Sequence, residues 1–543
     1  MRPIPRALTA VAGLSLLAGA LGPVAAADPA PPDAPVTLPA TVPSLTSWEA
    51  APGTWSMTSA TRVVGSEDLA RTRDLLASEL RAVTGEAVPT APQDPDAGDI
   101  SLSLDPDRLA ELGVEGYELR VSADGIAVTG ADARGVFYGT RTVGQMLRQQ
   151  RVLPAGSAVD VPRYAERGVT ACACQINIQG DWIDRLLTDM ADLKLNHLLL
   201  EMKLKSDRHP EANTWSYYTR ADVSRLVSRA RDLGIDVIPE INSPGHMGIW
   251  LENLPEYQLV DRDGRRHPEM LDLSNPRAVQ YYLDLVDEYD GVFTTRYWHM
   301  GADEYMIGTS PANFPALARW AEQTYGAGAT VNDAFIAFVN QVNAHVKARG
   351  KSLRMWNDGV VPTNVVSLDQ DITVEFWYAS GVRADVLAGR GYRVMNASDA
   401  LYWSRSATFY KMDSERLWNS DWDVGRFPGA GIDPGNPMVT GAKLSIWPDD
   451  SVYQTENEVE EEVFDSLRFV SQMTWTASHG GMDWAQFKGS VDAVGRNPLW
   501  DNVARRPVEA GTYTLTATGS DAEGTAVDHP DLRRLLERYP LSA

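Results

Sequence analysis

Between residues 167 and 495, eight short β-type runs alternate with amphipathic helical stretches. This alternation limits the folds that the chain can adopt more than any other feature of the sequence. The runs lie at 168–176, 197–201, 236–242, 296–301, 352–356, 372–377, 392–396 and 443–447. The clearest helical stretches lie at 183–193, 220–233, 278–289, 331–349 and 458–478. Repeated strand-then-helix units predict an α/β fold whose parallel strands close into a (β/α)8 TIM barrel. A doubly wound open sheet is the alternative, but no glycine-rich phosphate loop follows the first run.

A smaller unit precedes the predicted barrel. It combines helical periodicity at 69–83 and 135–149 with two alternating strands at 116–129, which is typical of an α+β domain. We therefore divide the chain into a leader, a Pro- and Ala-rich linker, an accessory domain, the barrel and a C-terminal extension. These segments are expected at 1–27, 28–44, 45–162, 163–495 and 496–543.

The first 27 residues have the pattern of a secretory signal peptide. Arg2 and Arg6 precede an apolar run at 7–21, and Ala25 to Ala27 offer a small-residue cleavage site. No later stretch reaches the ~18 apolar residues that a membrane-spanning helix needs. We expect a cleaved leader and a secreted protein with no membrane span; a retained membrane anchor is the alternative.

Charge and cysteine content exclude several classes of function. The formal net charge is −24, so the chain offers no basic stripe for the phosphates of a nucleic acid. Its two cysteines, Cys172 and Cys174, share one face of an expected strand, where we predict small buried apolar residues. The His, Cys and acidic residues show no metal-ligand spacing, so we expect neither a metal nor another cofactor.

Active sites of TIM barrels lie at the C-terminal ends of the strands. The residues expected there are carboxylates, amides and aromatics, with almost no Lys or Arg. They are Gln175, Glu201, Asn242, His246, Asp303, Glu304, Trp356, Asp358, Trp377, Tyr402, Trp447 and Asp449. Such a rim suits a neutral polyhydroxylated ligand better than a phosphate or a carboxylate.

Asp303 and Glu304 directly follow the fourth predicted strand. Paired carboxylates, one ionised and one protonated, are what glycosidic bond cleavage needs. Neighbouring residues on a strand point to opposite sides, however, so two adjacent acids do not naturally flank a bond as acid and nucleophile. This geometry favours a substrate that supplies its own nucleophile. A pair of solvated acids at a strand end is the simpler alternative.

Several motifs in this order resemble the family-20 glycoside hydrolases. They are Arg167-Gly168, the run 238–246 that ends in His246, the run 299–304, and the aromatics Trp356, Trp377, Tyr402 and Trp447. Residues 115–119 and 137–139 resemble the accessory domain of that family, and the likeness covers residues 48–489.

The resemblance implies retaining, substrate-assisted hydrolysis of a β-linked N-acetylglucosaminide, in which the 2-acetamido oxygen attacks C1 and forms an oxazolinium ion. It implies that Glu304 is the general acid and then the general base, and that Asp303 holds the acetamido N–H. Tyr402 would donate to the acetamido oxygen. The three pocket tryptophans would enclose the acetamide and the sugar ring, and His246 would tune Glu304 unless it is a structural histidine.

Four positions depart from the family pattern. Gln175 and Ser404 stand where ordinary hexosaminidases carry an Arg and an Asp that grip the 3- and 4-hydroxyls of a terminal sugar. Asn242 replaces an Asp, and Asp449 replaces a Glu. A further sugar on O3 would fill the freed space, as in the lacto-N-biosidase branch of the family, which releases Galβ1-3GlcNAc. The alternative is an exo-β-N-acetylhexosaminidase that removes single GlcNAc or GalNAc residues.

Glu201-Met202-Lys203-Leu204-Lys205 replaces the usual acidic pair of the family after the second strand, so His246 could lack a carboxylate partner there. Two other classes of function stay open. One is a non-catalytic carbohydrate-binding barrel, which the intact Asp303-Glu304 pair disfavours. The other is a glycosidase with a protein nucleophile or an inverting water, whose second carboxylate would be Glu240, Asp358 or Asp449.

Overall fold

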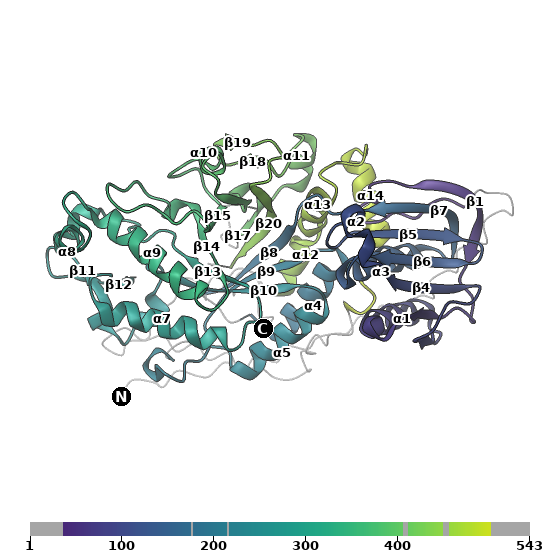
Figure 1. The fold of residues 1–543 in the computed structure, drawn as a ribbon, viewed down its shortest axis with the longest axis horizontal. Helices are drawn as coiled ribbons and strands as arrows, with labels where there is room; N and C mark the ends of the chain where they lie inside the picture. The colour runs from purple at the N-terminus through teal and green to yellow at the C-terminus, as the bar shows by residue number, and fades with distance from the viewer. Residues whose placement is uncertain (1–35, 175–177, 214–216, 405–410, 449–455, 501–543) are drawn as a thin grey trace, which may run out of the picture.

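The computed structural model describes residues 36–174, 178–213, 217–404, 411–448 and 456–500. These residues build a seven-stranded N-terminal sheet at one end of the molecule and a nine-stranded sheet at the other (Figure 1). Within these ranges, none of the helices has both the length and the apolar character needed to cross a membrane.

Eight strands of the larger sheet close into a parallel barrel. Each strand pairs in parallel with its neighbour, and the pairing of β16 with β20 closes the ring. The barrel strands are β8 (Glu166–Ala173), β9 (His197–Met202), β10 (Asp236–Ser243), β13 (Tyr297–Gly301), β14 (Ser352–Trp356), β15 (Thr373–Phe376), β16 (Arg393–Asn396) and β20 (Val439–Trp447). The TIM barrel is therefore confirmed. A ninth strand, β17 (Tyr402–Ser404), which the sequence did not predict, adds to β20.

Helices follow the strands where the periodicity predicts them. They are α4 (Gly180–Asp192), α5 (Arg220–Asp232), α7 (Pro276–Asp290), α9 (Val331–Lys347) and α13 (Phe464–Trp475). The stretch expected at 458–478 is broken at Val463, so that α12 (Glu456–Glu462) precedes α13. Further helices lie between or after these elements: α6 (Gly248–Leu251), α8 (Pro315–Tyr325), α10 (Ala384–Gly389), α11 (Ser414–Asn419) and α14 (Trp484–Val494).

The N-terminal sheet has the strand order β1-β7-β5-β6-β4-β2-β3. Its strands are β1 (Glu49–Ser56), β2 (Val63–Gly65), β3 (Thr90–Ala91), β4 (Asp99–Leu104), β5 (Tyr117–Ser122), β6 (Gly125–Gly130) and β7 (Val152–Asp160). Two helices, α1 (Ala70–Thr84) and α3 (Ala133–Gln149), pack on it. Helix α3 begins where Asp132 accepts a hydrogen bond from the Gly135 N–H at 2.8 Å. It is buried along most of its length, because the sheet covers one side and α4 and α14 contact it from the barrel.

The interior of the barrel holds charges as well as apolar side chains. Arg354 of β14 is fully buried and binds Glu166 of β8 at 2.7 Å and Glu375 of β15 at 2.5 Å. Lys443 of β20 adds a second cation, 2.5 Å from Glu375. Four strands are thus tied together by two cations and two carboxylates, and burial without partners would be costly for each of them.

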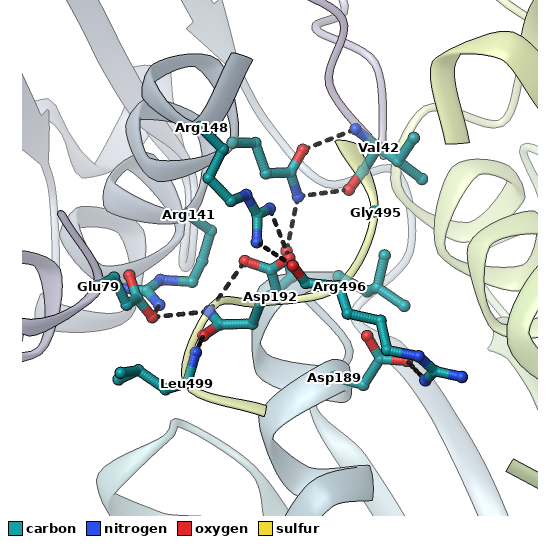
Figure 2. A network of polar contacts seen from close by, with 12 residues as sticks. Val42, Glu79, Arg141, Arg148, Asp189, Asp192, Gly495, Arg496 and Leu499 are labelled. Carbon is teal, nitrogen blue, oxygen red and sulfur yellow. Dashed lines mark hydrogen bonds and ion pairs between the residues drawn. The ribbon is translucent and has the colours of Figure 1, made fainter. Parts of the chain in front are cut away.

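A buried polar network joins the N-terminal domain to the barrel (Figure 2). Asp192, the last residue of α4, accepts from Arg148 of α3 at 2.8 Å, and its backbone carbonyl accepts from Gln145 at 2.9 Å. Asn497, beyond α14, donates to both Glu79 and Asp192, at 2.7 Å and 3.3 Å. The network therefore includes side chains from α1, α3, α4 and the C-terminal part of the described chain.

Further pairs extend this interface toward the first barrel strand. Lys194 lies 3.1 Å from Asp160, and Arg167 lies 2.7 Å from Glu115. The segment expected as a linker also takes part where the structure describes it: Val42 is fully buried, and its backbone exchanges two hydrogen bonds of 2.8 Å with Gln145.

The prediction for the two cysteines as separate apolar residues is wrong. Cys172, at the end of β8, and Cys174, just beyond it, form a disulfide. Their shared strand face explains the pairing, because side chains two residues apart point the same way and their Cα atoms lie 5.1 Å apart, within the range that a disulfide spans.

We expect Asp192→Ala to lower the free energy of unfolding by about 3–5 kcal/mol, because it leaves the Arg148 guanidinium buried without its carboxylate. Asp232→Ala is the matched control. Asp232 also bridges the two domains, to Arg71, but its side chain is 40% exposed, so the loss should stay below about 1 kcal/mol. Urea unfolding of both variants measures the difference; equal losses would contradict the prediction.

Candidate active site

The two acids sit on a turn rather than on a strand. Strand β13 ends at Gly301, and residues 301–304, called here the β13 loop, follow at the C-terminal face of the barrel. Gly301, Ala302 and Glu304 have positive φ angles of 70°, 69° and 51°. A Cβ on Gly301 would lie 2.0 Å from Asn242 Oδ1, so the loop requires glycine at this position. The left-handed turn removes the strand alternation, and both acids reach the same partner.

That shared partner is His246. Its Nε2 lies 3.1 Å from Glu304 Oε2 and 3.5 Å from Asp303 Oδ2. On its other side Asp303 accepts a hydrogen bond of 2.7 Å from the Asn242 amide, at the end of β10. The structure thus brings Asn242, His246, Asp303 and Glu304 together, as the sequence predicts.

The charges of this group depend on one another. Burial works to lower the pKa of His246, but the hydrogen bonds to Asp303 and Glu304 outweigh it and raise the pKa to about 11, with a further contribution from the charge of Glu201. Burial likewise works to raise the pKa of Asp303, yet His246 and then Asn242 hold it below its usual range. At neutral pH an imidazolium therefore faces an ionised Asp303.

Glu201 is the carboxylate near His246 that the sequence left in doubt. Its charge acts on His246, although the run 201–205 departs from the family pattern. Lys203 of the same run binds the Ile249 carbonyl of α6 at 2.6 Å. A carboxylate near His246 is therefore kept at the end of β9.

Four aromatic side chains line the space next to the acids. Trp377 and Tyr402 have parallel rings, 3° apart in plane, with centroids separated by 6.4 Å. Trp447 packs edge-on against both Trp356 and Tyr402, at 5.8 Å from each. Burial raises the pKa of Tyr402 well above its ordinary value, so its hydroxyl remains a hydrogen-bond donor at neutral pH. The result is an apolar box with one phenol.

Two carboxylates that the sequence analysis considered as the second catalytic carboxylate form hydrogen bonds to other residues of the site. Glu240 is fully buried and accepts from the Trp356 indole N–H at 3.0 Å. Asp358 accepts from the Glu304 backbone N–H at 2.9 Å and from the Trp377 indole N–H at 2.8 Å. Both therefore support pocket residues. The sequence could not show this, because each contact joins positions that are far apart along the chain.

Two predicted binding residues, Gln175 and Asp449, lie outside the described residues. Ser404 is described: it is buried at the end of β17 and pairs in register with Trp447 of β20. A short side chain with a hydroxyl group thus lies beside the aromatic box, at the position where the family pattern has an Asp.

We expect Gly301→Ala to lower the free energy of unfolding by about 2–5 kcal/mol, from left-handed strain and the clash with Asn242. Gly308→Ala is the control, because φ there is 69° and nothing lies within 4 Å of the added Cβ. Strain alone should cost the control about 1–2 kcal/mol. Chemical denaturation distinguishes the two, and a control as unstable as Gly301→Ala would show that the contact with Asn242 is unimportant.

Comparisons with known proteins agree with this geometry. The family model for the catalytic domain of glycosyl hydrolase family 20 matches residues 164–478, and the model for domain 2 of that family matches residues 38–161. The chain is 54% identical over 497 residues to the lacto-N-biosidase of Bifidobacterium bifidum, covering 90% of this chain and 45% of that protein. It thus spans about half the length of that relative.

More distant matches were found both in sequence and in structure. The beta-hexosaminidase subunit A1 of Dictyostelium discoideum is 24% identical, over 63% of this chain and 66% of its own length. The solved structure of the Streptomyces plicatus N-acetyl-beta-hexosaminidase, in complex with Thio-NAglucal, superposes with a TM-score of 0.69 at 21% identity, covering 87% of this chain and 97% of that one. With both domain models matched in order along one chain, this protein belongs to glycosyl hydrolase family 20.

Proposed function

We propose that this protein is a lacto-N-biosidase, a retaining glycosidase that releases Galβ1-3GlcNAc from the non-reducing ends of oligosaccharides or glycoconjugates. The observation that carries the proposal is the 54% identity, over 90% of this chain, to a protein of that name. The replacement of the expected carboxylate by Ser404 supports it, because a short side chain leaves room for a second sugar. We also propose, from the leader pattern alone, that the protein is secreted.

The proposed reaction uses the acetamide of the substrate as its nucleophile. The acetamido oxygen bonds to C1 while the glycosidic bond breaks, and Glu304 gives its proton to the departing oxygen. Water then attacks C1, Glu304 takes up the water proton, and the bond from C1 to the acetamido oxygen breaks. Two inversions at C1 leave the product with the β configuration of the substrate.

The geometry supports a separate role for each neighbour of Glu304. Asp303, held ionised by His246 and Asn242, can accept the acetamido N–H and stabilise the positive charge that develops on the oxazolinium ion. Tyr402, held protonated by its burial, can donate to the acetamido oxygen. The tryptophan walls exclude water and hold the acetamide close to C1.

The substrate preference is tested with two aryl glycosides. We expect a higher kcat/KM for aryl β-lacto-N-bioside than for aryl β-GlcNAc, because binding energy from the outer galactose can be used in the transition state. Product analysis of a Galβ1-3GlcNAc-terminated oligosaccharide should show release of the disaccharide in one cut. A higher kcat/KM for aryl β-GlcNAc would make the enzyme an exo-β-N-acetylhexosaminidase instead.

The role of Glu304 is tested with leaving groups of different basicity. Glu304→Gln should lower kcat by ~10²–10⁴-fold on oligosaccharides, whose departing oxygen needs a proton, and much less on activated aryl glycosides. Glu256→Gln makes the same chemical change at an exposed site and should leave both rates unchanged. Equal losses on both kinds of substrate for Glu304→Gln would argue against a general acid at this position.

A further inference from the structure

Asp358 connects two parts of the pocket that belong to different barrel strands. It follows β14 directly, in the short turn Asn357–Gly359. One carboxylate oxygen accepts the backbone N–H of Glu304, at 2.9 Å, and the other accepts the indole N–H of Trp377, at 2.8 Å. A single side chain therefore touches the main chain of the acid and a wall of the aromatic box.

The contact with Glu304 falls where the backbone needs support. Three of the four residues of the β13 loop have positive φ, including Ala302 and Glu304, which are not glycines. Such conformations persist only where surrounding contacts fix them. The turn after β14 supplies two such contacts. The first is the hydrogen bond of Asp358. The second is the close packing of Gly359, where an added Cβ would lie 2.0 Å from the Ala302 carbonyl oxygen.

The contact with Trp377 is reinforced by the neighbour of Asp358. The Asn357 side chain accepts the Trp377 backbone N–H at 2.9 Å and donates to the Tyr378 carbonyl at 2.9 Å. Asn357 thus fixes the main chain of this wall, while Asp358 fixes the orientation of the indole ring.

Both oxygens of Asp358 act as acceptors, so the two contacts are strongest with the ionised carboxylate. Burial, followed by the charge of Asp303, raises the pKa of Asp358 to about 7, against the opposing effect of the two N–H donors. The titratable groups that interact with it are Asp303, Glu304 and Tyr402, and the imidazolium of His246 pairs with both of these acids. As the pH falls through this pKa, one oxygen becomes a hydroxyl, which is a poorer acceptor, and the contact that it makes weakens.

We propose that Asp358 is a positioning residue, which ties the β13 loop to Trp377 and so fixes the spacing between the general acid and the acetamide pocket. This inference rests on the proposed function of Glu304 and Trp377, and it adds a residue that acts through them. The two contacts use different carboxylate oxygens, whereas an amide would turn its NH2 group toward one of the two N–H donors.

The first test is Asp358→Asn, measured on an oligosaccharide and on an activated aryl glycoside. Loss of one charge-assisted contact should lower kcat by ~10- to 100-fold on the oligosaccharide, more than on the aryl glycoside, while KM changes less. We expect the kcat of the wild type to fall as the pH drops below neutral, and this fall should disappear in Asp358→Asn. Asp371→Asn is the control, since Asp371 lies before β15, at the opposite end of the barrel, where it pairs with Lys347.

A second variant keeps the proposal testable if Asp358→Asn does not fold. Trp377→Phe retains a ring but removes the indole donor, which acts to lower the pKa of Asp358. The acid-side fall of kcat should therefore move to higher pH. An unchanged pH profile in Trp377→Phe would overturn the proposal, as would wild-type kcat or equal losses on both substrates in Asp358→Asn.

The test of Asp358 and the test of the biosidase assignment can be read independently of each other. Wild-type preference between aryl β-lacto-N-bioside and aryl β-GlcNAc tests the biosidase assignment by itself. The Asp358 and Trp377 variants are then compared with the wild type on whichever substrate it prefers, so one hypothesis can fail while the other holds.

Discussion

The salt bridges of Arg354 in the middle of the barrel are the interaction on which the site above them depends. Its guanidinium binds carboxylates from β8 and β15, and so ties β14 both to its neighbour β15 and to β8 on the opposite side of the barrel. Alternate residues of this strand place Arg354 in the core and Trp356 in the pocket wall, and the turn that follows places Asp358 against the β13 loop. Because alternate strand residues face the same side, the register of β14 sets the positions of both Arg354 and Trp356, and the start of the turn that carries Asp358.

Most of the fold could be predicted from periodicity. All eight barrel strands lie where alternating helices and apolar runs place them, because a parallel barrel repeats one simple unit that needs no long-range information. Strand β17 was missed, since three residues after a tight turn carry too little pattern. The Cys172–Cys174 disulfide was missed as well, although the shared face of the two side chains was recognised.

The candidate site could be predicted less completely. Residue types and order placed Asn242, His246, Asp303, Glu304 and the aromatics, and the structure brings them together. The strand rule failed for the adjacent acids, because a left-handed turn at Gly301 intervenes and only contacts with Asn242 and the β14 turn reveal it. The contacts of Asp358 and Glu240 join separate strands and leave no local signal.

The domain interface has a consequence for how this fold can be divided. Asp192, Lys194 and Arg167 belong to the barrel, yet each is buried against a partner of opposite charge in the N-terminal domain. A barrel expressed alone would expose these three charged side chains without their partners, and it would lose the apolar surface of α3 that covers it. We therefore expect the accessory domain to stabilise the barrel, and chimaeras between relatives should exchange the two together.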